Sequence, residues 1–422
     1  MLSLHMKLTV DNFAFIKHAD VTIDGITVIA GNNNTGKSTV GKILFAIFSV
    51  LKDINQKITD QRYRLIEKTL ISKILQNAGE KASSIMWKLD GEFDDFLSLQ
   101  GEKFSIDWNL FFRKYAEKVP GLEKAEIQQE IKHAVEQIES WPRLRLIKDA
   151  ASPYFSSCFN QQINSLTSPE IPAKVLLNIK DKEISMTFED NSVTEINPGI
   201  ELTNKVIFYS SPSVVDLMDA HMLDNLPMQH LINMLRQYSS RMVDDSDLFE
   251  KSMMKDRLVK VLNKIDTVLP GRIQKQRVGY GLARPEWKDP LSIKNLSMGL
   301  KAFVVLKILL ESNQLKDRDV LILDEPEIHL HPTWQLKYAE LIVLLQKEFN
   351  LSVVITTHSN FFLNAIETYS RKYATHKHLK LYLADVQSDG AVMQDVTNNP
   401  ELIYQKMAKA VDTLTSERLS YE

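Results

Sequence analysis

Apolar and polar positions alternate along residues 1–30, which is the pattern of half-buried β-strands. The runs read "LTVDNFAFIKHADVTI" and "ITVIA", and the dipeptide between them, Asp24-Gly25, is a common turn sequence. The pattern predicts a β-hairpin that feeds a core strand.

Helical spacing of apolar residues replaces this alternation from residue 51 to residue 170. The segment is rich in charge, as in "LEKAEIQQEIKHAVEQIES", and is interrupted at Pro120-Gly121 and at Trp141-Pro142. No heptad repeat is sustained long enough to predict a long coiled coil. We therefore expect a compact helical insertion over residues 51–170.

Strand-like sequence returns over residues 171–213, in "AKVLLNIKDKEISMTFED" and "KVIFYSSP", and residues 214–290 become helical again. Half of the chain's 14 methionines fall in this second helical segment: Met218, Met222, Met228, Met234, Met242, Met253 and Met254. Methionine is adaptable at partner surfaces, but it is more often ordinary core filler. From residue 291 onward, helices alternate with the apolar strands "VLILDEP" and "LSVVITTHS", which predicts βα units, a mostly parallel sheet and the α/β fold class.

The amino-acid composition excludes several classes of protein. The chain of 422 residues is 44% hydrophobic and carries a formal net charge of −3, so it can bury a large core and has no overall attraction to nucleic acid. Its single cysteine, Cys158, argues against a disulfide framework and against a zinc site built on thiolates. No apolar run is long enough to span a bilayer and no signal peptide is recognisable, so we expect a cytoplasmic protein with no membrane partner.

The segment "GNNNTGKS" at residues 31–38 matches the phosphate-binding loop pattern G-x-x-x-x-G-K-[ST] and lies between a β-branched strand and an amphipathic helix. Gly31 and Gly36 let successive amide groups converge on phosphates, Lys37 reaches the β- and γ-phosphates, and the Ser38 hydroxyl is suited to Mg²⁺. The apolar face of the helix that follows is predicted to be Val40, Ile43, Leu44, Ile47 and Phe48. We predict that ATP is bound by Gly31, Asn32, Asn33, Asn34, Thr35, Gly36, Lys37, Ser38 and Thr39.

Two carboxylates end the apolar strand Val320–Leu323. In a parallel sheet the carboxyl ends of strands meet at the edge where ligands bind. There Asp324 is predicted to hold Mg²⁺ and Glu325 to orient and deprotonate an attacking water. His329 and His331 follow; a transition-metal site is one interpretation of this pair, and a tight loop closed by Pro332 at the first position of a helix is the other.

Two further motifs occur at element ends. His358 follows the strand "LSVVITT", where a histidine can contact a γ-phosphate or the attacking water, although a packed polar residue is the ordinary alternative. Ser297, Gly299 and Lys301 form Ser-x-Gly-x-Lys directly before an apolar helix. Ser297 is a natural N-cap, and the exposed helix terminus is a potential anion site.

The order of these motifs resembles that of ABC-type ATPase heads. Within that superfamily, "DEPEIHLHP", "TTHSNFFLNAIE" and "NNNTGKST" are similar to the RecF, SMC and overcoming-lysogenisation-defect (OLD) group, in particular to prokaryotic anti-phage defence ATPases of the Septu or retron-associated type. The resemblance implies a domain order of 1–50 as the N-terminal part of the head, 51–170 as a helical insertion, 171–213 as strands returning to the head, 214–290 as a second, Met-rich insertion, and 291–422 as the C-terminal part of the head.

The resemblance also implies a head-to-tail dimer with ATP between the subunits. Gly36, Lys37, Ser38 and Thr39 would bind ATP and Mg²⁺ from one subunit, and Asp324, Glu325 and His358 would complete hydrolysis. Ser297, Gly299 and Lys301 would reach the γ-phosphate from the other subunit, and the loop of residues 329–331 would take the place of an inter-subunit contact. The family's coupling glutamine has no clear counterpart here, and the sequence Ser-Met-Gly favours a DNA-linked or defence head over a transporter head.

Three functions fit the sequence. One is a sensor ATPase that controls a separate nuclease of the HNH or topoisomerase-primase type, since the residues after His358 are too few for a nuclease domain of the OLD kind. Another is a RecF-like ATPase that clamps duplex DNA through the basic cluster Arg272, Lys275, Arg277 and Arg284. The last is a scaffold that ATP locks into a dimer with almost no hydrolysis.

Overall fold

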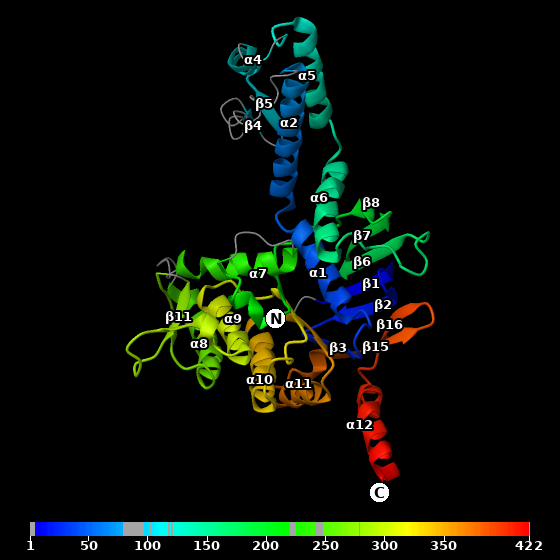
Figure 1. Ribbon diagram of the computed structural model, residues 1–422, viewed down its shortest axis with the longest axis vertical. Helices are drawn as coiled ribbons and strands as arrows, with labels where there is room; N and C mark the ends of the chain where they lie inside the picture. Colours follow the sequence, from blue (N-terminus) through cyan, green and yellow to red (C-terminus); the bar gives the residue numbers. More distant parts are fainter. Residues whose placement is uncertain are drawn as a thin grey trace. The chain divides into compact units, whose positions relative to one another are not determined.

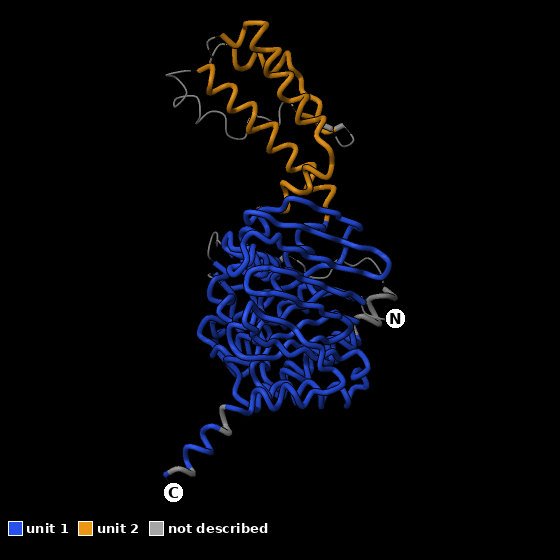
Figure 2. The backbone as a smooth tube through the Cα atoms, turned by 90° about the vertical axis from the view of Figure 1, so that its right-hand side faces the viewer, with its two compact units in different colours: residues 1–52, 153–422 blue, residues 53–152 orange. Residues whose placement is uncertain are grey.

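The computed structural model describes residues 5–78, 97–100, 103–116, 119, 121–219, 225–240, 248–277 and 279–421. The chain divides into two compact units, residues 1–52 with 153–422, and residues 53–152 (Figure 2). The insertion expected over residues 51–170 thus corresponds to a unit with closer bounds. Residues 214–290 fall within the first unit.

Among the described residues, the first unit is built on an 11-stranded sheet in the order β8-β7-β6-β1-β2-β16-β15-β3-β14-β13-β9 (Figure 1). Its strands are β1 (Met6–Phe13), β2 (Ile16–Ile23), β3 (Ile26–Gly31), β6 (Ala173–Ile179), β7 (Lys182–Glu189), β8 (Ser192–Asn197), β9 (Val206–Tyr209), β13 (Val320–Asp324), β14 (Ser352–Thr357), β15 (Leu379–Gln387) and β16 (Gly390–Asp395). Strands β15, β3, β14, β13 and β9 run parallel, whereas β8 to β2 are paired antiparallel. The predicted α/β class is confirmed; the sheet as a whole is mixed rather than mostly parallel, because the N-terminal strands and β6 to β8 add an antiparallel part.

The N-terminal hairpin differs in detail from the prediction. Strands β1 and β2 pair antiparallel around a turn at Ala14, which adopts a positive φ of 51°. Asp24-Gly25 leads out of the hairpin to β3, which is separated from β2 in the sheet by β16 and β15. The turn dipeptide therefore joins two strands that do not pair, because strands from the C-terminal part of the chain are inserted between them.

Besides this sheet, the first unit contains a set of helices. They are α1 (Lys37–Leu51), α7 (Leu226–Arg236), α8 (Leu248–Asp266), α9 (Met298–Glu311), α10 (Pro332–Phe349), α11 (Asn360–Lys372) and α12 (Glu401–Tyr421), with a short 3₁₀ helix η2 (Pro212–Val215). A small separate sheet contains β10 (Arg272–Lys275), β11 (Tyr280–Ala283) and β12 (Leu291–Ser292).

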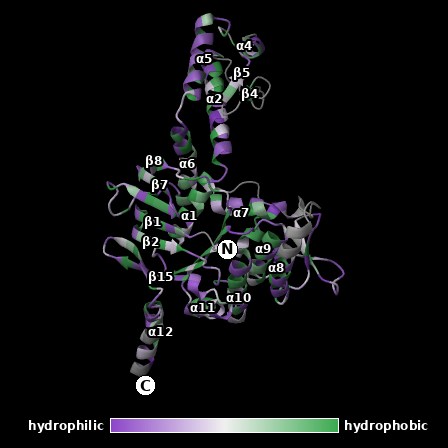
Figure 3. Cartoon of the chain, turned by 180° about the vertical axis from the view of Figure 1, so that it is seen from behind, coloured by the Kyte–Doolittle hydropathy of each residue, from purple (hydrophilic) through white to green (hydrophobic). Residues whose placement is uncertain are grey.

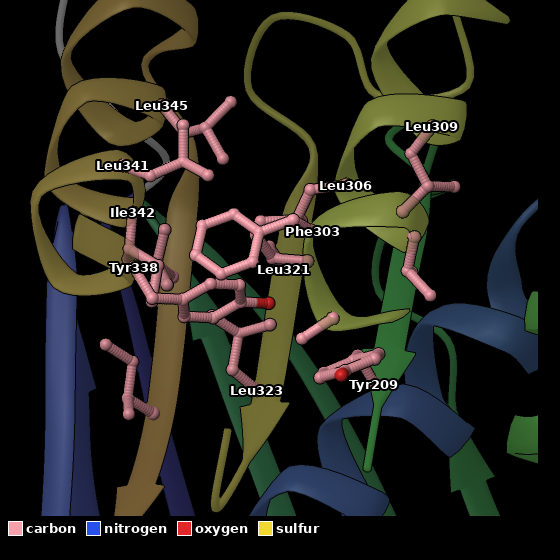
Figure 4. Packing of buried hydrophobic residues seen from close by; sticks show 14 of the residues in the cluster. Tyr209, Phe303, Leu306, Leu309, Leu321, Leu323, Tyr338, Leu341, Ile342 and Leu345 are labelled. Atoms are coloured by element: carbon pink, nitrogen blue, oxygen red, sulfur yellow. The ribbon is translucent and has the colours of Figure 1, made fainter. Parts of the chain in front are cut away.

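The largest core packs α9 and α10 against the parallel strands (Figure 4). The rings of Phe303 on α9 and Tyr338 on α10 meet edge to face, with centroids 5.2 Å apart, beside Leu321 and Leu323 of β13. Edge-to-face contacts of this kind add to the free energy gained by burying apolar area. This core therefore packs against β13, the strand that ends at Asp324.

The methionines of residues 214–290 contribute to this core where the structure describes them. Met218 and Met234 are buried, and Met228 packs against the same cluster. Met222 and Met242 lie outside the described residues, as do the side chains of Met253 and Met254. The three described methionines therefore serve as core filler.

The second unit is mainly helical. It contains α2 (Ile54–Ala78), β4 (Leu97–Gln100), β5 (Lys103–Ile106), α4 (Trp108–Ala116), α5 (Ala125–Glu139) and the first part of α6 (Arg143–Phe159). Ile66, Leu70 and Ile74, spaced four apart on α2, are fully buried in its own apolar cluster. Figure 3 shows α5 mainly in the hydrophilic colour, as expected of a helix that buries only one stripe. Within the part of the chain that the structure describes, no helix combines the length and apolar character needed to cross a membrane.

Candidate active site

The phosphate-loop sequence occupies the turn from β3 to α1, in the parallel part of the sheet. Gly36 has a left-handed backbone with φ 76° and precedes the first helical residue, Lys37. A Cβ atom on Gly31 would lie 2.4 Å from the carbonyl oxygen of Ala384 on β15, so only glycine fits there. Strand, loop and helix are thus arranged as the motif requires.

Lys37 spans the loop. Its side chain is buried, and its Nζ atom donates to the carbonyl oxygen of Asn32 at 2.7 Å and lies 3.6 Å from Oε1 of Glu325. Burial lowers the pKa of Lys37, while the nearby Glu325 opposes this shift. A buried ammonium ion with these partners gains further stabilisation when an anionic phosphate enters the loop.

Ser38 and Asp324 meet at the end of β13. The Ser38 hydroxyl donates to Oδ1 of Asp324 at 2.7 Å, and the Thr356 hydroxyl from the end of β14 donates to the same oxygen at 2.6 Å. Mg²⁺ takes oxygen ligands, typically one or two from protein, together with phosphate oxygens and water. The hydroxyl of Ser38 and the carboxylate of Asp324 fit that ion and would hold it. Sequence reasoning missed Thr356, although a threonine pair at the end of an apolar strand was a visible signal.

Glu325 lies beside this pair in a strained conformation. Its φ is 49°, in the left-handed region, and its N–H donates to both the carbonyl and the hydroxyl of Thr356, at 3.1 and 3.0 Å. A non-glycine residue at such an angle costs about 1–3 kcal/mol and persists only where its surroundings enforce it. The Glu325 Oε1 atom lies 3.5 Å from Nδ1 of His358. The structure therefore brings the two predicted catalytic residues together at adjacent strand ends.

A second glutamate nearby was missed by sequence reasoning. Glu327 is 2% exposed; its Oε1 accepts from the Thr357 hydroxyl and from the backbone N–H of His358, the latter at 3.3 Å. Burial raises the pKa of Glu327, and the hydrogen bonds from Thr357 and His358 oppose that shift. Its sequence position, after Asp324-Glu325-Pro326, gave no sign that the chain turns it back under β14.

The Ser-x-Gly-x-Lys motif is only partly exposed. Ser297 is exposed and caps α9, its hydroxyl oxygen accepting from the N–H of Leu300 at 3.4 Å. Gly299 is buried, and a Cβ atom there would lie 2.9 Å from the ring of Trp334 on α10. Lys301 is 5% exposed, and its Nζ atom donates to both carboxylate oxygens of Asp216, at 2.7 and 2.8 Å.

This arrangement differs from the expectation for Lys301. Its ammonium group is held by Asp216 of the same chain, just after η2, rather than presented to a second subunit. Of the three motif residues, Ser297 alone presents its side chain outward. Lys301 instead ties the first turn of α9 to the segment that follows β9.

The pair His329 and His331 lies in the loop between β13 and α10. His331 caps α10, with its Nδ1 atom accepting from the N–H of Thr333 at 3.4 Å, and Pro332 is the first helical residue. The described residues include no group of three or more His, Cys, Asp or Glu side chains placed to hold a metal. The loop interpretation is thus confirmed for His331 and Pro332.

The residues of the basic cluster at 272–284 differ in solvent exposure. Arg272, Lys275 and Arg277 are exposed on or beside β10. Arg284 stacks over Trp287, 4.5 Å from the ring centroid, and its Nε atom donates to the carbonyl of Pro270. Three of the four predicted nucleic-acid contacts are therefore accessible, and the fourth is engaged within the chain.

Comparison with known proteins identifies the family. A family model described as an AAA ATPase domain matches residues 6–363. The chain belongs to this family. Its phosphate loop, Asp324 and Glu325 all lie within the matched residues. The predicted ATPase class is confirmed at that level.

The chain is also similar to three solved SMC head structures. One, "Crystal structure of the SmcHead bound to the C-winged helix domain of ScpA", has 13% identity and a TM-score of 0.42, covering 92% of this chain and 97% of that one. The SMC head domain from Thermotoga maritima has 12% identity and a TM-score of 0.39, covering 93% and 99%. The Smc head domain with an extended coiled coil bound to the C-terminal domain of ScpA, derived from Pyrococcus furiosus, has 12% identity and a TM-score of 0.41, covering 99% and 100%.

Proposed function

We propose that this chain hydrolyses ATP at a site formed by its phosphate loop and the ends of β13 and β14. The observation that carries the proposal is the hydrogen-bonded set of Ser38, Thr356 and Asp324, with Glu325 held beside it by Thr356. A cation ligand, a phosphate-binding loop and the Glu325 carboxylate, which lies 3.6 Å from Lys37 and 3.5 Å from His358, are thus gathered at one edge of the sheet.

Each residue has a defined task in this proposal. The amides of residues 31–36 and the ammonium of Lys37 bind the phosphates, while Ser38 and Asp324 hold Mg²⁺, which neutralises phosphate charge when bound. Glu325 orients the attacking water and accepts its proton. His358, beside Glu325, contacts the γ-phosphate or that same water.

A second copy of the chain completes the site in this proposal. The outward-facing Ser297 and the N-terminus of α9 form an anion-binding end that suits a γ-phosphate bound by another subunit. Head-to-tail pairing of two such surfaces gives two equivalent sites per dimer. Lys301 is proposed to support this surface through Asp216 rather than to touch the nucleotide.

Asp324→Asn is expected to lower the rate of ATP hydrolysis at saturating Mg²⁺ by about a hundredfold or more, because the amide is a poor ligand for a hard cation. Nucleotide binding in the presence of a chelator should stay within about threefold of native, since the loop and Lys37 are unchanged. A steady-state rate measured against Mg²⁺ concentration checks the first expectation and equilibrium binding the second. Native Mg²⁺ dependence in the variant would contradict the assignment of Asp324.

The biological role we propose is that of a cytoplasmic sensor subunit in an anti-phage defence system, in which the ATP-bound dimer restrains a separate nuclease of the HNH or topoisomerase-primase type. Support comes from the resemblance of "DEPEIHLHP" and "TTHSNFFLNAIE" to OLD-like defence ATPases. A nuclease gene next to this one, and loss of phage resistance on Glu325→Gln substitution, are the expected observations. A neighbouring set of repair genes with unchanged phage resistance would contradict the role.

Duplex DNA binding is a second candidate, favoured by the exposed positions of Arg272, Lys275 and Arg277. If these side chains contact phosphates, the logarithm of DNA affinity falls linearly with the logarithm of salt concentration, with a slope of about −0.9 per phosphate neutralised. Replacing all three by Ala is expected to reduce that slope by about 2–3 and to weaken binding uniformly across DNA sequences. Fluorescence anisotropy over a range of salt concentrations measures both quantities.

A matched control for this experiment is the triple Ala variant of Lys174, Lys180 and Lys182, three exposed lysines on or beside β6 and β7. It removes the same formal charge from another surface and is expected to keep the native salt slope. Equal slopes in native protein and both triple variants would exclude the β10 surface as a DNA contact.

A further inference from the structure

Glu327 lies in the turn after β13, at the position where the chain passes under the end of β14. It is 2% exposed, although it is an acid and lies in a loop. Its Oε1 atom accepts from the Thr357 hydroxyl and, at 3.3 Å, from the backbone N–H of His358. One carboxylate oxygen therefore holds both Thr357, the last residue of β14, and His358, which follows it.

Glu327 also stabilises the turn in which it lies and, through Thr357, the start of α11. The carbonyl oxygen of Glu327 accepts from the N–H of Leu330 at 2.9 Å. The Thr357 hydroxyl accepts from the N–H of Ser359 at 3.0 Å, and Ser359 caps α11. Glu327 is thus the point at which the turn carrying Glu325 is joined to the segment that carries His358.

The ring of His358 depends on this junction. Its Nδ1 atom lies 3.5 Å from Oε1 of Glu325 and 3.9 Å from Oε1 of Glu327, and its side chain is 43% exposed. A half-exposed ring gains little orientation from packing. The direction of the imidazole is therefore set by its backbone, which Glu327 holds, and by the two carboxylates.

Packing alone does not account for an acid at this position. The Oε2 atom of Glu327 is buried and makes no hydrogen bond among the described residues. A buried polar atom without a partner costs about 1–3 kcal/mol, so an apolar side chain of similar size would be the cheaper core residue. The hydrogen-bond acceptor at Oε1 is what an apolar residue would not supply.

We propose that Glu327 is a positioning residue that sets the orientation of His358 relative to Glu325 during ATP hydrolysis. The inference rests on the proposed function of the same site. Glu327 touches neither nucleotide nor water in this account; it acts through Thr357 and the backbone of His358. Displacement of a reacting group by about 1 Å can lower a rate by about a hundredfold, so a lost anchor has a measurable effect.

Two variants separate the acceptor from the charge. Glu327→Leu removes the acceptor and is expected to lower kcat by at least about tenfold while the KM for ATP stays within about twofold. Glu327→Gln keeps an acceptor oxygen for Thr357 and His358, so kcat should stay within about threefold of native. If the Leu variant keeps native kcat, or if the Gln variant loses as much as the Leu variant, the proposal is wrong.

Asp319 provides a matched structural control. It is 3% exposed at the other end of the same loop-and-strand segment and accepts hydrogen bonds from the N–H groups of Lys205 and Lys316, both at 2.8 Å. Asp319→Leu removes a similar buried acceptor outside the site. It is expected to lower the melting temperature as Glu327→Leu does, but to keep native kcat per folded molecule.

A spectroscopic readout keeps the inference testable whether or not hydrolysis is observed. With histidine side chains labelled, the imidazole signal lost in His358→Asn identifies His358 in the full-length protein. That signal is expected to move farther in Glu327→Leu than in Glu327→Gln and to stay at its native position in Asp319→Leu. An unmoved signal in Glu327→Leu would overturn the positioning role, whereas a native protein without ATPase activity would overturn the proposed function alone.

Discussion

The Glu325→Gln variant is expected to bind ATP as tightly as the native protein and to accumulate as an ATP-bound dimer. Glutamine is nearly isosteric and can adopt the same left-handed backbone, whose φ is 49°, with the same N–H bonds to Thr356. It has no basic carboxylate to accept a proton from water, so hydrolysis should slow by about a hundredfold or more. Without hydrolysis, the interaction that closes the dimer persists.

The Lys37→Ala variant is expected to behave in the opposite way. Removing a buried ammonium that faces the phosphates should weaken ATP binding by about a hundredfold or more, because charge-assisted hydrogen bonds to phosphate are among the strongest in proteins. Without bound ATP, the contact that the nucleotide would make between two subunits is absent. This variant should remain in its apo oligomeric state at every ATP concentration tested.

Light scattering after size-exclusion chromatography, with and without ATP and Mg²⁺, distinguishes the two variants. Lys42→Ala, on the same helix but outside the phosphate loop, is the control for general effects on α1 and should behave like the native protein. Equal ATP-dependent dimerisation of Lys37→Ala and Glu325→Gln would contradict the roles assigned to both residues.

Single strands and helices were predictable from the sequence where a run of adjacent residues determines them. The alternation in residues 1–30, the helix after the phosphate loop and the apolar strand before Asp324 each follow from a run of adjacent residues. The pairing of β2 with β16, and of β3 with β14 and β15, was not predictable, because these partners lie hundreds of residues apart in the sequence. Asp24-Gly25 was correctly predicted to be a turn, but the prediction that it closes a hairpin was wrong.

The site likewise contains residues that the sequence predicted and residues that it did not. The sequence predicted that Ser38 and Asp324 hold one Mg²⁺ ion, and in the structure their side chains are joined by a hydrogen bond, with Glu325 directly after Asp324. Thr356 and Glu327 were missed because their role depends on how β13 and β14 are aligned, with Asp324 opposite Thr356. The order of motifs is no guide to such cross-strand contacts.

At Lys301, the position of the side chain differs from what the motif suggested. A lysine next to a helix N-terminus suggests a phosphate contact, but the helix turns this side chain inward, where Asp216 takes both of its short hydrogen bonds. The spacing of three residues from Met298 to Lys301 does not reveal which face of α9 is covered. Lys301 lies on the side of α9 that packs against η2 and the following Asp216, whereas Trp334 covers Gly299.

In the proposed dimer, one ATP is bound by two copies of the chain, by the phosphate loop of one and by the Ser297 helix end of the other. Ser297→Arg would place a bulky cation at the exposed cap and block that surface. Each homodimer, of Lys37→Ala or of Ser297→Arg, then has two defective sites. In a mixed dimer one site carries both defects and the other carries neither.

The cap itself needs a control, since losing an N-cap costs about 1 kcal/mol wherever it occurs. Asn225 is exposed and caps α7 in the same way, accepting from the N–H of Met228 at 3.1 Å. Asn225→Arg is therefore expected to lose a similar amount of stability and to keep ATPase activity on its own.

The most direct test is the ATPase rate of an equimolar mixture of Lys37→Ala and Ser297→Arg subunits, compared with each variant alone. If subunits exchange freely, half of the dimers are mixed and each has one intact site, so about a quarter of the native rate should return. A mixture no more active than its separate components, under conditions where subunit exchange is demonstrated, would contradict the shared site.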